Sequence, residues 1–191
     1  ERTIQALFGM MSRDRITELL QKGVPPFVTG SVSYGGFVDG YEVLNIEATA
    51  KPNEGDVAFK SIFTEAQRIN KHGFTPGELE RAKTNYLTSL ESRYKQRDKI
   101  SNDLYARDYK SNFIENEPLT SIDFDWQFAQ AIVPTITVEE VSARAKQWMT
   151  QENRVFVVTG PDKPEAKHLT QEQAFSIMKE VENSTIEPYA D

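Results

Sequence analysis

Cysteine is absent from the 191 residues of the chain. A disulfide framework, a thiol nucleophile and a cysteine-based zinc site are therefore excluded. Histidine is nearly as scarce, because the chain has 2 histidines, His72 and His168. Neither has a second histidine four positions away, so both common helical zinc motifs, His-Glu-x-x-His and the inverted His-x-x-Glu-His, are missing. We therefore expect no metal site in this chain.

Long apolar runs are missing too, since no stretch approaches the ~20 apolar residues that a membrane-spanning helix needs. Basic residues are in deficit: 22 Lys and Arg stand against 29 Asp and Glu, which gives a net charge of −7. A nucleic-acid-binding face or an anionic membrane surface requires clustered basic residues. We therefore expect no nucleic-acid partner and no membrane span. Hydrophobic residues make up 38% of the chain, which is ordinary for a globular protein.

Nucleophilic and nucleotide-binding motifs are also absent. Gly30-Ser31-Val32-Ser33-Tyr34 lacks the final glycine of a Gly-x-Ser-x-Gly elbow, and the chain has no P-loop and no Gly-x-Gly-x-x-Gly. No secretory signal pattern opens the chain, whose first residue is Glu1 rather than Met. We expect a fragment of a larger protein, with one domain over residues 1–183 and a linker or tail over 184–191.

Two segments near the start predict an antiparallel hairpin. Apolar residues recur at three- and four-residue spacing over the first twenty positions, which predicts a helix that ends before Pro25 and Pro26. Residues 27–34 are rich in strand formers, and apolar and polar residues alternate strictly over 41–50. A third strand is predicted over 154–160, because a near-continuous apolar run is typical of a strand covered on both faces.

The rest of the chain has mainly helical patterns. Helices are predicted over 56–71, from 76 to about 109, over 121–131, after 137 and after 170, with a loop over 112–118. Thr75 with Glu78, and Thr137 with Glu140, form capping boxes. The order of elements predicts an α+β fold with a mainly antiparallel sheet and helices packed on one face. Three strands are few for so many helices, so we expect a further strand before Glu1.

Several polar and aromatic groups could carry chemistry, but each has a simpler structural role. His72 precedes Gly73 at a predicted helix end, where a cation suits the helix dipole, and His168 lies in a polar loop. The charge run over 91–99 is typical of a solvated helix face. The acidic pairs lie in loops or near helix starts, where carboxylates are favoured anyway: Glu115 and Glu117, Asp123 and Asp125, Glu139 and Glu140.

Three aromatic residues follow one another closely, Phe124, Trp126 and Phe128. No basic residues interleave them to make a base-stacking platform, so they predict core packing or an interdomain contact. The residues alone therefore predict a soluble, acidic α+β domain without a catalytic constellation.

Three stretches, taken in order and spacing, resemble a known family. They are residues 8–19 (FGMMSRDRITEL) with Pro25-Pro26-Phe27 behind them, 73–83 (GFTPGELERAK) and 153–161 (NRVFVVTGP). Together they resemble the second-type repeat of the pitrilysin/insulinase family of zinc metallopeptidases, over residue 1 to about 161. The resemblance implies an α+β domain of the processing-peptidase type. Such domains form two bowls that close around a peptide chamber.

The resemblance also implies zinc in the parent protein but not in this chain. In the family, zinc is held in the first domain by an inverted His-x-x-Glu-His helix and a distal Glu. There it polarises the scissile carbonyl and its bound water while the motif Glu acts as general base. None of these residues can be carried over, because the motif is absent here.

A second family signature is an Arg and a Tyr, seven residues apart, which reach the substrate across the chamber. Matching Glu18 to the family's helix acid puts Leu20 and Phe27 at these positions. Matching Arg15 instead gives Gln21 and Val28. Neither pair is Arg and Tyr, so the chain lacks the substrate-clamping pair, and its substrate-binding residues stay unknown. In four-domain members this is expected of the second domain.

The resulting prediction is a non-catalytic domain that walls the chamber and supports the zinc-bearing domain. Its partners would be the remaining domains of the parent chain or a homologous subunit, and a polypeptide substrate. The alternative is a peptide-binding or scaffold domain of a catalytically silent homologue. A hydrolase within the fragment itself is disfavoured by the missing zinc ligands. The compartment stays open, with periplasmic and secreted forms both compatible, and a fragment should leave apolar area exposed.

Overall fold

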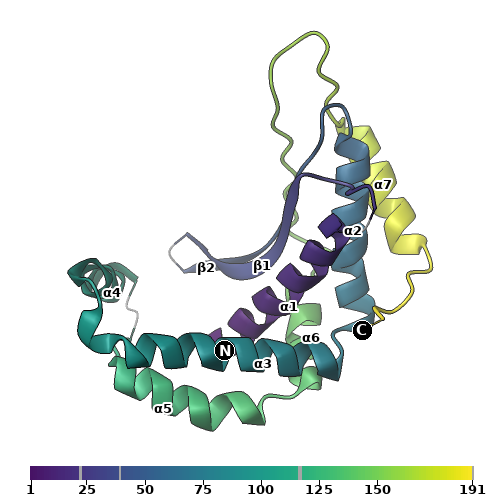
Figure 1. Ribbon diagram of the computed structural model, residues 1–191. Coiled ribbons are helices and arrows are strands. Elements are labelled where there is room, and N and C mark those ends of the chain that lie inside the picture. Colours follow the sequence, from purple (N-terminus) through teal and green to yellow (C-terminus); the bar gives the residue numbers. More distant parts are fainter. Residues whose placement is uncertain (22, 39, 116–117, 191) are drawn as a thin grey trace.

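The computed structural model describes residues 1–21, 23–38, 40–115 and 118–190 (Figure 1). Over these described residues, two strands and seven α-helices follow in this order: α1 Arg2–Gln21, β1 Thr29–Val38, β2 Tyr41–Thr49, α2 Gly55–His72, α3 Pro76–Lys95, α4 Asn102–Glu115, α5 Ile122–Ile132, α6 Val138–Trp148 and α7 Gln171–Asn183. Two short 3₁₀ turns stand between helices, Arg97–Lys99 and Val133–Thr135.

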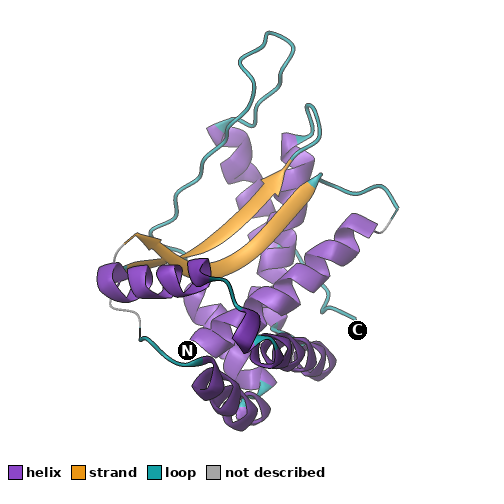
Figure 2. Ribbon diagram, turned by 60° about the vertical axis from the view of Figure 1, so that its left-hand side comes forward, coloured by secondary structure: helices purple, strands orange, loops and turns teal. Residues whose placement is uncertain are grey.

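β1 and β2 form an antiparallel hairpin whose two faces differ in polarity. Val32 pairs with Ile46, and both contact the core that α1 and α2 form on one side of the sheet (Figure 2). Ser33 pairs with Asn45 on the opposite face, which the described helices leave uncovered. The α+β class and the helices on one face are thus as predicted. The sheet is smaller than predicted, because two strands pair in the described residues and the fold is largely helical.

The predicted strand over 154–160 is wrong. The residues lack strand pairing, and Val155 and Val157 are 88% and 73% exposed. An apolar run indicates burial on both faces, but burial requires a neighbouring strand and a covering layer. Within the described part of the chain, no strand pairs with this segment.

The single helix predicted from 76 to about 109 is also wrong, because α3 ends at Lys95. Arg97 folds back at this point: its guanidinium lies 4.3 Å from the centre of the Tyr94 ring and donates to the Tyr94 carbonyl at 2.9 Å. The side chain therefore satisfies a helix-end carbonyl that would otherwise accept from the next turn. α4 then continues to Glu115, through part of the predicted loop.

Helix starts agree with the sequence. Thr75 and Thr137 each accept from the amide three residues on, and Glu78 and Glu140 return the bond, so both capping boxes form. The helix predicted over 121–131 begins behind Ser121, whose side chain accepts from the Phe124 amide. Each cap depends on residues within one helical turn, and all three caps form in the structure.

Residues 184–190 curve from the end of α7 to the C-terminal end of α2 (Figure 1). His72 Nε2 donates to the Ile186 carbonyl at 2.7 Å, and Arg68 Nε donates to the Glu187 carbonyl at 3.1 Å. The division into a domain over 1–183 and a linker or tail over 184–191 stays a prediction, but residues 184–190 are held by side chains of α2.

The core lies where α1, the hairpin, α2, α3 and α6 meet. Phe8 of α1 is fully buried and makes edge-to-face contacts with Phe74 at 5.8 Å and Trp148 at 5.2 Å between ring centres. Edge-to-face aromatic contacts add to the stabilisation from burial itself. Phe8 therefore joins α1 to the start of α3 and the end of α6.

We expect Phe8→Ala to lower the free energy of unfolding of the 191-residue chain by about 3–5 kcal/mol, because it opens a cavity between three elements. Phe113→Ala is the control, since Phe113 is 88% exposed on α4, and should change stability by less than about 0.5 kcal/mol. Urea unfolding followed by circular dichroism measures both. Equal losses in the two variants would contradict this core assignment.

Candidate functional site

The two histidines lie in separate structural settings and each has a backbone partner. His72 ends α2, as predicted, and its Nε2 donates to the Ile186 carbonyl. His168 Nε2 donates to the Pro161 carbonyl at 3.1 Å in an exposed loop. In the described ranges, no three His, Asp or Glu side chains gather closely enough to hold a metal ion. The donors present therefore do not fit a zinc site.

Three members of the acidic pairs, Asp123, Asp125 and Glu140, have structural partners. Asp123 lies 3.5 Å from Arg97 Nε, and Asp125 accepts from Thr120 Oγ1 at 2.6 Å. Glu139 and Glu140 lie in the first turn of α6, where Glu140 belongs to the capping box. The pair of Glu115 and Glu117 falls outside the described side chains.

The aromatic group of α5 divides in two. Trp126 stacks on Tyr94 of α3, with 6.1 Å between ring centres, so it joins two helices. Phe124 and Phe128 stack on each other at 5.8 Å and are about half exposed. The charge run over 91–99 includes an exposed ion pair between Glu91 and Lys95 at 2.7 Å, which suits a solvated helix face.

The two positions matched to the family's Arg and Tyr lie in or against the hydrophobic core. Phe27 is fully buried ahead of β1, and Leu20 packs against the same core from the end of α1. In the alternative match, Gln21 is exposed and Val28 is 55% exposed. Neither match supplies a charged group or a phenol that could hold a peptide.

A buried charged cluster lies at the junction of α1, α2 and α3. Arg15 is 2% exposed and donates to both oxygens of Glu78, through Nε at 2.5 Å and Nη2 at 2.8 Å. Its Nη1 donates to Glu65 at 3.3 Å, and its Nη2 also donates to the Gly73 carbonyl at 2.9 Å. Glu65 receives a second ion pair from Arg68 at 2.7 Å. Such a fork-to-fork geometry combines charge with directional hydrogen bonds.

Two aromatic rings cover the Arg15 guanidinium. Its central carbon lies 4.9 Å from the centre of the Phe74 ring and 4.4 Å from that of Tyr189. The Tyr189 hydroxyl also donates to Glu18 of α1 at 2.5 Å. The cluster thus gathers three helices and the segment behind α7, with every Arg15 nitrogen engaged. Its burial and full pairing suit a structural clamp and leave no group free to act on a substrate.

Sequence reasoning missed this cluster, although a signal was present. Arg15 lies on the inner face of α1 together with Met11, Ser12 and Ile16, which are all buried. A charged residue inside an apolar stripe indicates a buried partner, because an unpaired buried charge is costly. The capping box accounts for only part of the role of Glu78, because the same carboxylate accepts from Arg15 and from the Thr75 amide at 2.7 Å.

Two tyrosines, Tyr34 of β1 and Tyr86 of α3, have raised pKa values. Partial burial raises the pKa of Tyr34, and the hydrogen bond and charge of Glu42 raise it further. Tyr34 also stacks on Trp148, at 4.2 Å between ring centres. Burial raises the pKa of Tyr86 against the opposing effect of its hydrogen bond with Thr3. Both phenols therefore stay protonated and do not serve as general bases near neutral pH.

We expect Arg15→Met to destabilise the chain by about 3–5 kcal/mol, because it leaves two buried carboxylates without their cation. Arg13→Met is the matched control on the exposed face of α1 and should cost less than about 0.5 kcal/mol. Urea unfolding measures both variants. An Arg15→Met chain as stable as the control would show that the cluster is dispensable.

No family model matches the chain. A zinc protease described as PQQL-like from Arabidopsis thaliana is 25% identical over 83 residues, which are 44% of this chain and 9% of that protein. The chain thus spans a small part of this relative's length.

Solved structures share the fold. The first half of the periplasmic protease PqqL from Escherichia coli matches 100% of this chain with a TM-score of 0.81 and 18% identity, and the chain covers 41% of it. A predicted insulinase family protease from Yersinia pestis matches 95% of the chain with a TM-score of 0.68 and 12% identity, and the chain covers 38% of it. The resemblance seen in the sequence is thereby confirmed as a likeness: the chain is similar to zinc proteases of the pitrilysin/insulinase type in sequence over 83 residues and in fold over its whole length.

Proposed function

We propose that the chain is a non-catalytic domain of a zinc-dependent metalloendopeptidase, which walls the substrate chamber and supports the zinc-bearing domain. The observation that carries the proposal is that the whole chain matches part of the first half of PqqL, a periplasmic protease. The chain covers 41% of that solved half. Proteolysis would then be done by the parent protein, with zinc held outside these 191 residues.

The donor chemistry supports a role without zinc. His72 and His168 both engage backbone carbonyls, and the carboxylates of the buried cluster are engaged by Arg15 and Arg68. The apolar packing of Leu20 and Phe27 supports the second-domain assignment, because neither position offers a group that could hold a substrate.

The sheet supports the role as a chamber wall. Its outer face carries mainly polar side chains, including Ser33, Asn45 and Glu47, with Val43 exposed among them, which suits contact with a water-filled space (Figure 2). Its inner face rests on α1 and α2, which the Arg15 cluster ties to α3. A rigid wall with a polar surface can border a peptide without binding one side chain tightly.

The alternative is a peptide-binding or scaffold domain in a catalytically silent homologue. The same missing zinc ligands and the same polar sheet face favour it. The two proposals differ in the parent protein alone: the first requires a zinc-dependent activity there, and the second requires its absence.

The test uses the full parent protein and a fluorogenic peptide library. We expect a zinc chelator to abolish cleavage and added zinc to restore it. The double variant His72→Gln, His168→Gln should keep the bound zinc and a kcat/KM within about twofold of the parent's, because neither histidine is a ligand. Zinc content is measured by atomic absorption.

Loss of zinc in the double variant, with the fold intact by circular dichroism, would place a ligand in this chain and contradict the proposal. A parent that binds no zinc and cleaves no peptide would favour the silent homologue.

A further inference from the structure

Residues 154–160 form an extended segment at the surface of the molecule. Among the described residues, no backbone hydrogen bond reaches this segment. Its apolar side chains are exposed on both sides, at 88% for Val155, 40% for Phe156, 73% for Val157 and 42% for Val158. Exposed apolar side chains and unpaired main-chain groups together are the features of an edge that awaits a strand.

The segment is nevertheless held in place at its start. Arg154 donates to the Thr150 carbonyl at 2.7 Å and forms an ion pair with Glu182 of α7 at 2.7 Å. The Phe156 ring lies against Phe59 of α2, with 4.7 Å between ring centres. The segment therefore follows the side of the molecule that α2 and α7 form.

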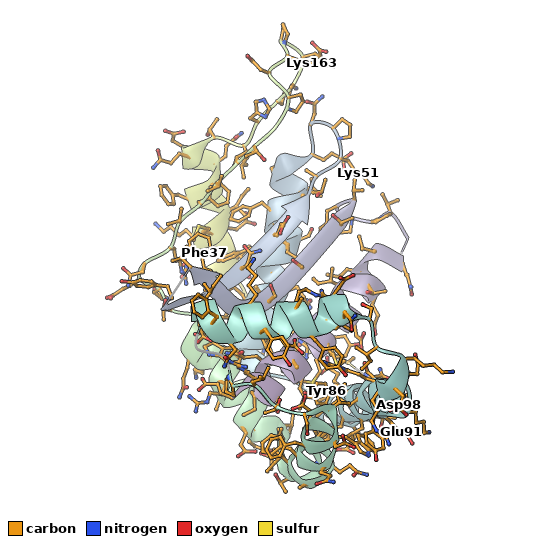
Figure 3. All side chains as sticks on the ribbon, turned by 90° about the vertical axis from the view of Figure 1, so that its left-hand side faces the viewer. Phe37, Lys51, Tyr86, Glu91, Asp98 and Lys163 are labelled. Atoms are coloured by element: carbon orange, nitrogen blue, oxygen red, sulfur yellow. The ribbon has the colours of Figure 1, made fainter. Side chains whose placement is uncertain are left out.

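β2 lies on the same side and has a free edge. In the part of the chain that the structure describes, β2 pairs with β1 and with no other strand. Figures 2 and 3 show the segment that leads up to the Lys163 loop, then β2, then β1, in that order across the molecule. The free edge of β2 is therefore the edge that faces the segment.

A common apolar surface, called the floor below, underlies both β2 and residues 154–160 and includes Phe59 and Phe63 of α2. Ile46 of β2 packs into the same cluster as Phe63 and Phe59 of α2, together with residues of α7. Phe59 in turn contacts Phe156 of the segment. The floor is therefore apolar all the way from Ile46 of β2 to Phe156 of the segment.

We propose that an extended strand of the parent polypeptide, from outside these 191 residues, lies between β2 and residues 154–160 and pairs with both. The inference rests on the proposed function, since it requires a larger parent. The strand presents apolar side chains to the floor at every second position, as the pleat of a sheet requires.

The main-chain amides and carbonyls of β2 and of residues 154–160 favour an extended strand as the occupant. A helix satisfies its own backbone groups, so it cannot pair with the amides and carbonyls of β2 and of residues 154–160. An extended chain offers both rows of donors and acceptors at once. A segment of the same polypeptide is favoured over a separate one, because its linkage raises its effective concentration. The chain covers 41% of the first half of PqqL, so a parent of that size would supply such a segment.

The first measurement is amide hydrogen exchange on the full parent protein. We expect amides within 154–160 to exchange at least about 100-fold more slowly than those of the exposed loop 161–168, because a paired strand exchanges through rarer openings. The amides of β1 are the internal reference for a paired strand. Exchange in 154–160 as fast as in the loop would overturn the proposal.

The second measurement identifies the occupant. Val157 is replaced by the photo-cross-linker p-benzoylphenylalanine in the full parent, and Lys163 at the loop tip is the matched control site (Figure 3). Isotope-labelled and unlabelled parents are mixed before irradiation. A cross-link from position 157 to a parent segment outside these 191 residues, within one molecule, supports the proposal. Cross-links between labelled and unlabelled molecules, or none beyond those of the control site, would overturn it.

Zinc-dependent cleavage is assayed on the same samples. Cleavage with unprotected amides in 154–160 would sink the strand proposal alone. A protected and cross-linked segment in a parent that neither binds zinc nor cleaves peptide would sink the protease proposal alone.

Discussion

The bidentate ion pair between Arg15 and Glu78 is the constraint on which the helical layer depends. A buried guanidinium is tolerated when its nitrogens all donate hydrogen bonds. Those of Arg15 donate to Glu65 of α2, to Glu78 of α3 and to the Gly73 carbonyl in the connection between these helices. Moving any of these elements would leave a buried charge unpaired. The same Glu78 carboxylate caps α3, so the start of this helix and its crossing with α1 are fixed by one group.

Features set by neighbouring residues could be predicted from the sequence. Strict alternation over 41–50 gave the correct faces of β2, and the Thr75 and Thr137 boxes gave the correct helix starts. Both signals depend on contacts within a few positions, which the sequence displays directly. The α+β class follows from such local elements.

Features set by distant residues could not be predicted in the same way. The periodicity of residues 76–109 does not reveal the end of α3 at Lys95, where helix α5 packs against α3 through Trp126 and Tyr94. The apolar run over 154–160 indicated burial but not the strand that burial requires. The candidate site had the same limit: the local sequence around Arg15 contains one member of the cluster, and Glu65, Glu78 and Tyr189 come from far along the chain.

The contact between Tyr189 and Arg15 has a consequence for the order of folding during synthesis. Tyr189 bonds Glu18 across a separation of 171 residues, whereas the β1–β2 hairpin pairs residues that are at most about twenty apart. A ribosome releases the N-terminal part first, so the hairpin and α1 form while Tyr189 has not yet been added. Until then one face of the Arg15 guanidinium lacks its aromatic cover and stays open to water. The fully shielded charge is thus acquired only once residue 189 has been added, after the elements around Arg15 have already met.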